Sequence, residues 1–296
     1  MNCPNCKAYN PSNANYCAQC GTALETPEDE ARDRQERDPA QPGNQYRPFA
    51  TPGELPATGQ LTPRTLSQLI TETFTIYRNS FVVFWRIALV AQIPLFIGNF
   101  IANENIVLSL SLATLFTGLL ANGATTYAVT QYYLKRTATA STSYAAALNN
   151  SMSLLGAFVV FVVAMVPAAL LSLILIGLPL LTFIILAWFF YVQAIMVEEK
   201  GAMAALSRSW ELVRWSWQRV LGIGVVFLLI LFSAGMAVSI PGALLGLAND
   251  TLGSLLITTG TVLVTPIGYV GAAVVYFDLR VRKEGYNLEM LSSEAE

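Results

Sequence analysis

Long apolar runs, separated by short polar breaks, occupy most of the chain after about residue 80. Each run is close to the roughly 20 helical residues that are needed to cross the hydrocarbon core of a bilayer. The pattern therefore predicts an all-α polytopic membrane protein. We expect six transmembrane helices, at about residues 80–102, 106–134, 153–176, 178–197, 220–240 and 251–277.

A short amphipathic stretch recurs before the spanning segments. The stretch 205–217, ALSRSWELVRWSW, aligns with 69–81, LITETFTIYRNSF, and a weaker copy lies at 147–158. Tryptophan and arginine on an amphipathic helix suit the membrane interface and anionic lipid. We interpret these stretches as interfacial elbow helices. Their expected interfacial residues are Phe74, Arg78, Phe81, Arg208, Trp210, Arg214 and Trp217.

The elbows divide the membrane domain into three units, at about 65–136, 142–200 and 201–283. Each unit would consist of one elbow and two spanning helices. Because every unit starts and ends on the same side, the three would be parallel, unlike the inverted repeats that are common in transporters. A chance alignment of basic and aromatic juxtamembrane helices is the alternative.

The distribution of charge gives the expected orientation. Only 12% of the residues are charged and 54% are hydrophobic, whereas soluble domains have about 25% charged residues. All 17 Lys and Arg residues fall on one side of the predicted topology, and the loops near 103–105, 177–179 and 241–251 contain none. Lys and Arg concentrate in cytoplasmic loops. We therefore expect a multi-pass protein of the cell membrane with both termini in the cytoplasm and without a cleavable signal peptide.

All four cysteines lie in the first 24 residues, as two C-x2-C pairs separated by ten residues. Each pair can form a tight knuckle whose two thiolates bind one metal ion, and four thiolates suit tetrahedral zinc. Two disulfides are disfavoured in a reducing cytosol, and an iron–sulfur or redox site is the other alternative. A core this small usually needs such a staple. The prediction is a zinc ribbon over residues 1–24 with one structural Zn²⁺ on Cys3, Cys6, Cys17 and Cys20.

The ribbon is expected to bind protein and not nucleic acid. Its only base is Lys7, and a phosphate-binding face needs clustered Lys and Arg. Residues 25–63 are rich in proline and mixed charge, which predicts a disordered linker, although the charge run 28–38 could form a short helix. The ribbon is therefore expected to be tethered and not docked. The six-helix domain would cover 64–290, followed by a tail at 291–296.

Three segments of the membrane domain resemble a known family. The elbow ETFTIYRNSF, the block RSWELVRWSWQRVLG and the ending TPIGYVGAAVVYFDLRVRKEGYNLEML are similar to the membrane domain associated with glycerophosphoryl diester phosphodiesterases. The similarity covers about residues 65–290 and implies a six-helix membrane module that sometimes accompanies a phosphodiesterase barrel. The first 24 residues resemble the zinc ribbons that precede membrane domains in many prokaryotic proteins.

Phosphodiesterase activity is not expected from this resemblance. The family's catalytic domain uses histidines for acid–base chemistry and carboxylates for a metal, but this chain has no histidine. None of its soluble segments has the roughly 250 residues of a barrel. The acids at the inner boundaries, Glu198, Glu199, Glu211, Asp278 and Glu284, are interpreted as solvated ion pairs.

Polar residues within the spanning segments leave two functions open. Arg86 is expected to snorkel to the inner face, with a substrate or lipid-headgroup site as the alternative. Thr258 and Thr261 could line a polar seam, although such residues more often mark close helix packing. The sequence favours a non-enzymatic membrane scaffold or lipid-associated anchor whose ribbon recruits a cytosolic protein. The alternative is a transporter or channel for a lipid or small solute.

Overall fold

The computed structural model describes residues 2–10, 16–17, 19, 21–22, 24, 63–101, 103–172 and 177–294. This part of the chain is mainly helical, and six of its helical stretches are long and apolar enough to cross a membrane. The fold is thus compatible with a multi-pass membrane protein. Residues 25–62, which make up nearly all of the predicted linker, lie outside the described residues.

Each of three short helices is followed by two long helical stretches. The first set is α2 (Leu66–Asn79), α3 (Phe81–Gly98) and α4 (Glu104–Tyr133). The second is α5 (Ala140–Asn149), α6 (Ser151–Ser172), and α7 (Gly177–Ala187) with α8 (Tyr191–Glu198). The third is α9 (Ala202–Val213), α10 (Trp217–Gly246) and α11 (Asp250–Glu284), before a final α12 (Leu288–Glu294).

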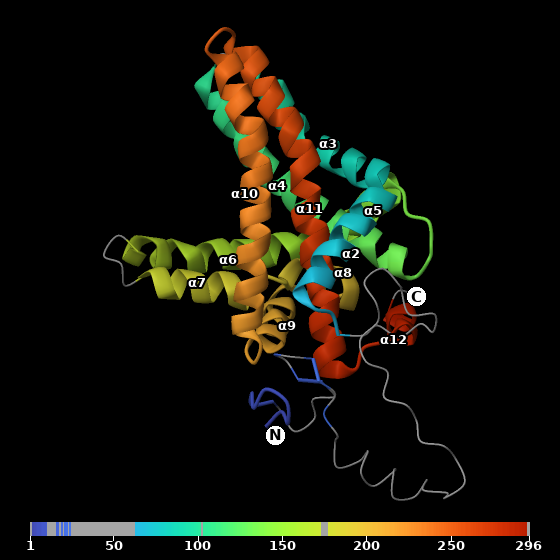
Figure 1. Cartoon of the computed structure of the whole chain (residues 1–296). Helices are drawn as coiled ribbons and strands as arrows, with labels where there is room; N and C mark the ends of the chain where they lie inside the picture. The colour runs from blue at the N-terminus through green and yellow to red at the C-terminus, as the bar shows by residue number, and fades with distance from the viewer. Residues whose placement is uncertain are drawn as a thin grey trace, which may run out of the picture.

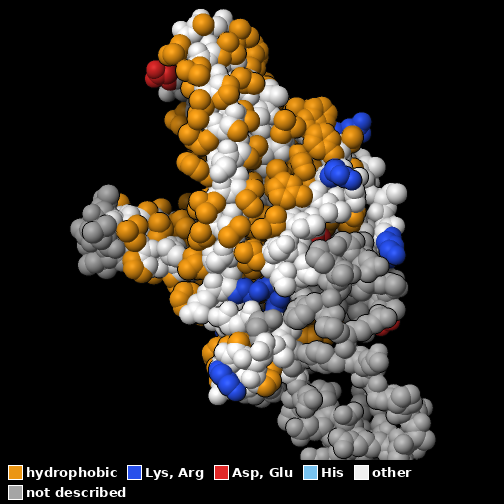
Figure 2. Space-filling model, in the orientation of Figure 1, with side chains coloured by type: hydrophobic (Ala, Val, Ile, Leu, Met, Phe, Trp, Pro, Cys, Tyr) orange, Lys and Arg blue, Asp and Glu red, His pale blue; other side chains and the backbone are white. Residues whose placement is uncertain are grey.

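The long helices form two groups. Helices α3, α4, α10 and α11 make up the tall bundle in Figure 1, and the α6–α7 hairpin projects from its base. On the face shown in Figure 2, hydrophobic side chains cover the upper end of the bundle and the hairpin, while Lys and Arg side chains lie along the right side and below the hairpin. Large exposed apolar patches mark a lipid or protein interface, which agrees with helices that are surrounded by lipid.

One residue interrupts the helix between α2 and α3, and another between α5 and α6. Ser80 has φ −117° and ψ 28°, and Asn150 has φ −97° and ψ 7°. At the third junction residues 214–216 separate α9 from α10, and Ser216 has φ −125° and ψ 17°. The quoted stretch 205–217 is therefore two helices with a break, not one elbow.

The elbow of the second unit, the weaker copy in the sequence, was predicted at the wrong position. The predicted copy at 147–158 spans the last turn of α5, the break at Asn150 and the first turns of α6. Its apolar residues have the same helical spacing as an elbow because both kinds of helix bury one side. The short helix that precedes the second hairpin is α5, which starts at Ala140 after a capping box on Thr139.

Residues at equal distances from the three breaks are buried in the same way. Seven residues before each break lies a buried hydroxyl side chain, on Thr73, Ser143 and Ser209. Apolar side chains are buried four residues after the breaks and again seven residues after them, at Phe84, Leu154 and Val220 and at Ile87, Ala157 and Ile223. The three short-to-long junctions therefore pack against the core through equivalent faces.

The C-terminal part of α11 is the most deeply buried part of this helix. Every residue from 273 to 282 is buried, and this part of the chain carries Asp278, Arg280 and Arg282. Charged side chains are almost never fully buried unless they are paired, so this end of α11 cannot face lipid tails. It lies instead beneath the surface that contacts the ribbon, which is described below.

Close helix packing makes Gly260 a sensitive position. A Cβ atom at Gly260 would lie 2.0 Å from Cγ1 of Val238 on α10, whereas a Cβ at Gly222 would meet nothing within 4 Å. We expect Gly260→Ala to lower the free energy of unfolding by about 1–3 kcal/mol through overpacking. Gly222→Ala should be neutral or stabilising by up to about 1 kcal/mol. Unfolding in mixed detergent micelles measures both, and equal effects would contradict this packing.

Candidate metal centre and its docking surface

The first cysteine knuckle is closed by backbone hydrogen bonds. The Cys3 N–H donates to the Ala8 carbonyl at 2.9 Å, and the Lys7 N–H donates to the Cys3 carbonyl at 3.0 Å. Lys7 has a φ of 60°, in the left-handed region, which lets the chain turn back after Cys6. An isolated antiparallel bridge between Asn2 and Tyr9 completes this small hairpin.

The second knuckle repeats this pattern. The Cys17 N–H donates to the Thr22 carbonyl at 2.7 Å, and the Gly21 N–H donates to the Cys17 carbonyl at 2.9 Å. Gly21 has a φ of +77°, the conformation that glycine adopts without steric cost. The described part of the ribbon therefore consists of two equivalent turns, each built around a cysteine.

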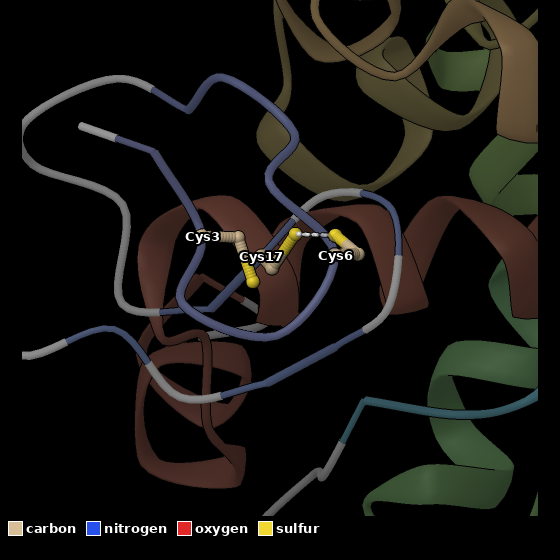
Figure 3. Close-up of side chains that lie close together, drawn as sticks. All are labelled: Cys3, Cys6 and Cys17. Carbon is tan, nitrogen blue, oxygen red and sulfur yellow. Dashed lines mark hydrogen bonds between the residues drawn. The ribbon is translucent and has the colours of Figure 1, made fainter.

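Three cysteine side chains converge between the two knuckles (Figure 3). The sulfur atoms of Cys3, Cys6 and Cys17 all lie within 4.8 Å of one another, and those of Cys6 and Cys17 are 3.5 Å apart. Thiolates on one tetrahedral zinc would be about 3.8 Å apart, given Zn–S bonds of about 2.3 Å. The three described cysteines thus fit a metal site. Cys20, the fourth predicted ligand, lies outside the described residues.

The side chain of Asn10 lies next to the sulfur cluster. Its side chain is fully buried, and its Nδ2 atom lies 2.8 Å from the Ala8 carbonyl and 3.5 Å from the sulfur of Cys17. Hydrogen bonds from outer-shell groups orient metal ligands and tune their charge. Asn10 was not singled out in the sequence because nothing in its local pattern indicates a contact with a cysteine seven residues away.

The ribbon lies against the membrane domain, so the expectation that it is only tethered is wrong. Nη1 of Arg282 donates to the Cys17 carbonyl at 3.2 Å, and a Cβ atom at Gly21 would approach the same nitrogen to 2.8 Å. Gln19 donates through Nε2 to Oε1 of Gln218 at 2.8 Å. The rings of Tyr9 and Trp215 are 5.9 Å apart. These contacts define the docking surface.

Asp278 lies beneath the docking surface and bonds to the groups that contact the ribbon. Its carboxylate is completely buried and accepts hydrogen bonds from the Arg64 backbone N–H at 2.7 Å, Nε of Arg282 at 2.9 Å and Nη2 of Arg219 at 3.1 Å. The same two guanidinium groups donate to the Arg64 carbonyl at 2.6 and 2.7 Å. Asp278 is therefore a buried, fully paired carboxylate and not the solvated acid that its boundary position suggested.

Arg64 extends this network to α2 and α4. Its guanidinium pairs with Glu72 and lies 5.7 Å from the centre of the Tyr133 ring. The Tyr133 hydroxyl donates to Glu72 at 2.8 Å. Burial raises the pKa of the Glu72 carboxyl above its ordinary value, and the attraction of Arg64 only partly offsets this. Residue 64, where the membrane domain begins, is thus fixed by both its backbone and its side chain.

A second ionic cluster joins the ends of α8, α9 and α11. Nε of Arg208 donates to both oxygens of Glu198, at 2.9 and 2.8 Å, and its other end pairs with Glu284. The Tyr276 hydroxyl also donates to Glu198. Arg208 therefore holds three helices together, and its guanidinium is occupied by acids of the fold, whereas its place on the amphipathic stretch 205–217 predicted an interfacial residue facing anionic lipid. Glu198 and Glu284 are likewise paired within the fold.

The C-terminal residues are tied into the fold. Arg280 donates to both carboxylate oxygens of Glu294, at 2.7 and 2.8 Å, and its guanidinium lies 3.6 Å from the centre of the Tyr286 ring. Burial opposes ionisation of Glu294, but hydrogen bonds from Arg280 and Tyr286 lower its pKa below the ordinary value. Residues 291–294, which the sequence suggested were a tail, belong to α12 and pack on the domain.

The remaining elbow residues lie at the surface, as an interfacial role requires. Phe74, Phe81 and Trp217 are partly exposed, and Arg78 and Arg214 are exposed. Trp210 packs its ring 5.1 Å from that of Phe183 on α7.

Thr258 and Thr261, the threonines of the predicted polar seam, bond mainly along α11. Thr258 donates to the Ser254 carbonyl and accepts from Asn99, and Thr261 donates to the Thr258 carbonyl. Both threonines therefore satisfy much of their hydrogen bonding on their own helix. Arg86 is exposed on α3 and does not join them.

A cavity of about 290 Å³ lies instead among α3, α4 and α11. Its polar lining includes Gln92, Asn122 and Thr265, and Oε1 of Gln92 is buried without a hydrogen-bond partner in the described part of the chain. Gln92 stands in the apolar run of the first spanning segment. A single uncharged polar residue there gave no signal that could be separated from ordinary helix packing.

The comparison with known families decides where the membrane domain belongs. Residues 86–279, more than half of the chain, match the family described as a domain of unknown function, DUF7847. The chain belongs to this family. No curated protein matches the chain, and no solved structure does.

The matched DUF7847 region contains only part of the docking surface. It includes Arg219 and Asp278 but ends before Arg282, and it begins after Arg64 and the ribbon. In this member of the DUF7847 family the buried carboxylate therefore lies in the family's region with Trp215 and Gln218, while Arg282, Arg64 and the ribbon itself flank that region.

Proposed function

We propose that this protein is a non-enzymatic membrane scaffold whose zinc ribbon recruits a cytosolic protein. One observation carries the proposal. The second knuckle rests on the membrane domain through Cys17 and Gly21, whereas residues 4–7 of the first knuckle are exposed. A small module that is fixed on one side and exposed on the other is suited to presenting a binding surface.

The metal in this proposal is one Zn²⁺ held by the thiolates of Cys3, Cys6, Cys17 and Cys20. When bound, it supplies folding free energy to a ribbon that has almost no apolar core, about 10–16 kcal/mol for comparable sites. Asn10 orients the buried thiolate of Cys17, and the two knuckle turns hold the cysteine backbones. The ribbon itself would carry out no chemistry.

The acidic groups at the inner surface support a role without catalysis. Glu72, Glu198, Asp278, Glu284 and Glu294 are each paired with an arginine. A general base must be free to take a proton from a substrate, and carboxylates that already accept several charged hydrogen bonds are poor candidates. These groups are better explained as the framework that positions the ribbon and the helix ends.

The proposed orientation places both termini in the cytoplasm, with three parallel units in the cell membrane. The short helices and the basic residues would lie at the inner leaflet, where Lys and Arg are favoured. The similarity of α11 and its ending to the membrane domain of glycerophosphoryl diester phosphodiesterases supports the same six-helix organisation. It gives no reason to propose their activity, since the chain has no histidine.

Recruitment can be tested by crosslinking and purification from native membranes. Lys7→Glu changes the exposed first knuckle without touching a sulfur atom. Lys135→Glu is the matched charge reversal outside the ribbon, because Lys135 is likewise exposed and has a similar left-handed φ. We expect the partner to be lost from the Lys7→Glu protein and kept by the Lys135→Glu protein, with equal zinc content in both. A partner that is retained by both variants would overturn the recruiting role.

A transporter or channel remains the second candidate, and the cavity among α3, α4 and α11 favours it. Arg86 and Thr258 do not line this cavity, so substitutions at these two positions would not test transport through it. If the cavity carries a solute, Gln92→Leu with Asn122→Leu should reduce flux in proteoliposomes severalfold. Flux equal to that of the unaltered protein would count against transport through this cavity.

A further inference from the structure

A second cavity, of about 380 Å³, lies at the junction between α2 and α3, beside the end of α4. Two arginines line it, Arg78 from α2 and Arg136 from the segment after α4. The other polar lining residues are Asn79, Ser80, Tyr132 and Thr137, and no acidic residue is among the lining residues. The cavity is therefore a concave site with two positive charges.

The two arginines are available to a ligand. The ion pairs of the described residues involve neither Arg78 nor Arg136, and both side chains are exposed. This separates them from Arg64, Arg208, Arg219, Arg280 and Arg282, which are paired with acids in the same region. Asn79 donates to the Tyr132 hydroxyl at 3.1 Å, which fastens α2 to α4 beside the cavity.

The start of α3 lies at the same cavity, where its partial positive charge is offset in part by the C-terminal end of α2, which also ends at Ser80. Ser80 precedes this helix and makes no side-chain capping hydrogen bond, so its hydroxyl is not used by the helix. The N-terminal end of a helix carries a partial positive charge and favours anions, phosphate groups in particular. Here that end opens into the same cavity as the two guanidinium groups.

The rim of the cavity is apolar. Phe81 and Val82 line it and are 39% and 54% exposed, at the first turn of a helix that is apolar enough to span a membrane. A ligand with a phosphate and adjacent acyl chains matches both parts of this surface. A soluble phosphate ester would leave the apolar rim uncovered.

The equivalent positions at the other two junctions differ. The second junction has Leu148 where the first has Arg78, and Asn150 where the first has Ser80. The third junction has Arg214, but its guanidinium lies 5.6 Å from the centre of the Trp215 ring, and Glu211 is one helical turn away. The first junction thus brings together a cavity, two arginines that no acid pairs with among the described residues, and a lining without acids.

We propose that this cavity binds the phosphate group of an anionic phospholipid, with Arg78 and Arg136 as its two cationic contacts. Guanidinium groups bind phosphate oxygens in bidentate fashion, and the acyl chains would lie along Phe81 and Val82. The site is independent of the ribbon and its partner, since the cavity includes no residue of either knuckle.

Native mass spectrometry of the purified full-length protein tests the proposal. The protein is loaded with dioleoyl phosphatidylglycerol or with dioleoyl phosphatidylcholine, and the retained lipid is counted. We expect the phosphatidylglycerol to be retained preferentially. The double variant Arg78→Gln, Arg136→Gln should bind it about tenfold or more weakly, because both basic contacts are lost. Arg214→Gln with Lys200→Gln removes the same charge elsewhere and should keep the lipid.

The outcomes separate the site from general attraction to a basic surface. Equal loss in both double variants, or equal retention of the two lipids, would overturn the proposal. The melting temperature of each variant shows whether it is folded. If the double variant does not fold, the single variant Arg136→Gln is used in its place. Binding of glycerol 3-phosphate, a soluble phosphate ester, is measured in the same way. If it binds as tightly as the lipid, a soluble phosphate ester is the ligand and the lipid proposal fails.

Discussion

Removing the metal should unfold the ribbon and release it from the membrane domain, while the helices remain folded. Cys17 is at once one of the three clustered cysteines and the residue whose carbonyl accepts the hydrogen bond from Arg282. Its loss as a ligand therefore affects both the metal and the docking. Comparable structural zinc sites contribute about 10–16 kcal/mol to folding, so neither a chelator-treated ribbon nor a Cys17→Ser ribbon should stay folded.

Hydrogen exchange and tryptophan fluorescence measure this release. With the metal removed, amides in residues 2–24 should exchange at the rate of an unfolded chain, and the environment of Trp215 should change because Tyr9 leaves its ring. Amides of α11 beyond the docking surface should keep their protection. A chelator added to the Cys17→Ser protein should have no further effect. Unchanged protection of residues 2–24 after complete metal removal would contradict this account.

Replacing Asp278 with alanine should be the most destabilising single change in the membrane domain. The substitution removes the carboxylate that Arg219 and Arg282 share and the acceptor of the Arg64 N–H. Removing one partner of a buried ion pair costs about 3–5 kcal/mol because the other charge is left uncompensated. The same change should also weaken docking of the ribbon, since Arg282 would lose the group that orients it.

Asp250 provides the matched control for this prediction. It is exposed in the first turn of α11, where an acid stabilises the helix end by about 0.3–1 kcal/mol. Unfolding of both variants in mixed micelles gives the comparison. If Asp278→Ala costs no more than Asp250→Ala, the buried network does not hold the inner end of the domain together.

The sequence predicted the spanning helices well because the bilayer fixes their length. All six predicted runs coincide with apolar helical stretches, with shifts of a few residues at their ends. The larger differences occur in α10, which continues through Pro241 to Gly246, and in α11, which continues past its apolar run to Glu284. Helical hydrogen bonding continues past the apolar run where the next residues are buried or reach the interface, and hydropathy does not detect that.

The elbows were predicted less well, and the reason lies in the spacing of apolar residues. Both the short helices and the long ones bury residues at intervals of three and four, so the window 147–158 resembled an elbow although it crosses the break at Asn150. The better signal was the threonine before α5. Thr139 forms a capping box like that of Thr65 before α2, and such caps mark helix starts directly in the sequence.

The docking surface could not be predicted because its parts are distant in the sequence. Cys17, Arg64, Arg219 and Asp278 come together only in the folded chain, and a helical wheel shows only the residues of one helix. The i,i+4 pair of Asp278 and Arg282 was visible as a local salt bridge. Its position at the end of an apolar run suggested exposure to water, whereas α2 and α10 in fact cover it.

Site-specific photocrosslinking from two positions tests most directly whether the ribbon docks through its second knuckle and Tyr9 and exposes residues 4–7 of the first knuckle. A benzophenone amino acid at Gln19, whose side chain contacts Gln218, should crosslink within the chain to the start of α10. The same group at Lys7 should not reach α10 and should instead capture another protein. Chelation should abolish the crosslink from Gln19. A crosslink from Lys7 to α10, or none from Gln19 with the metal bound, would contradict the account.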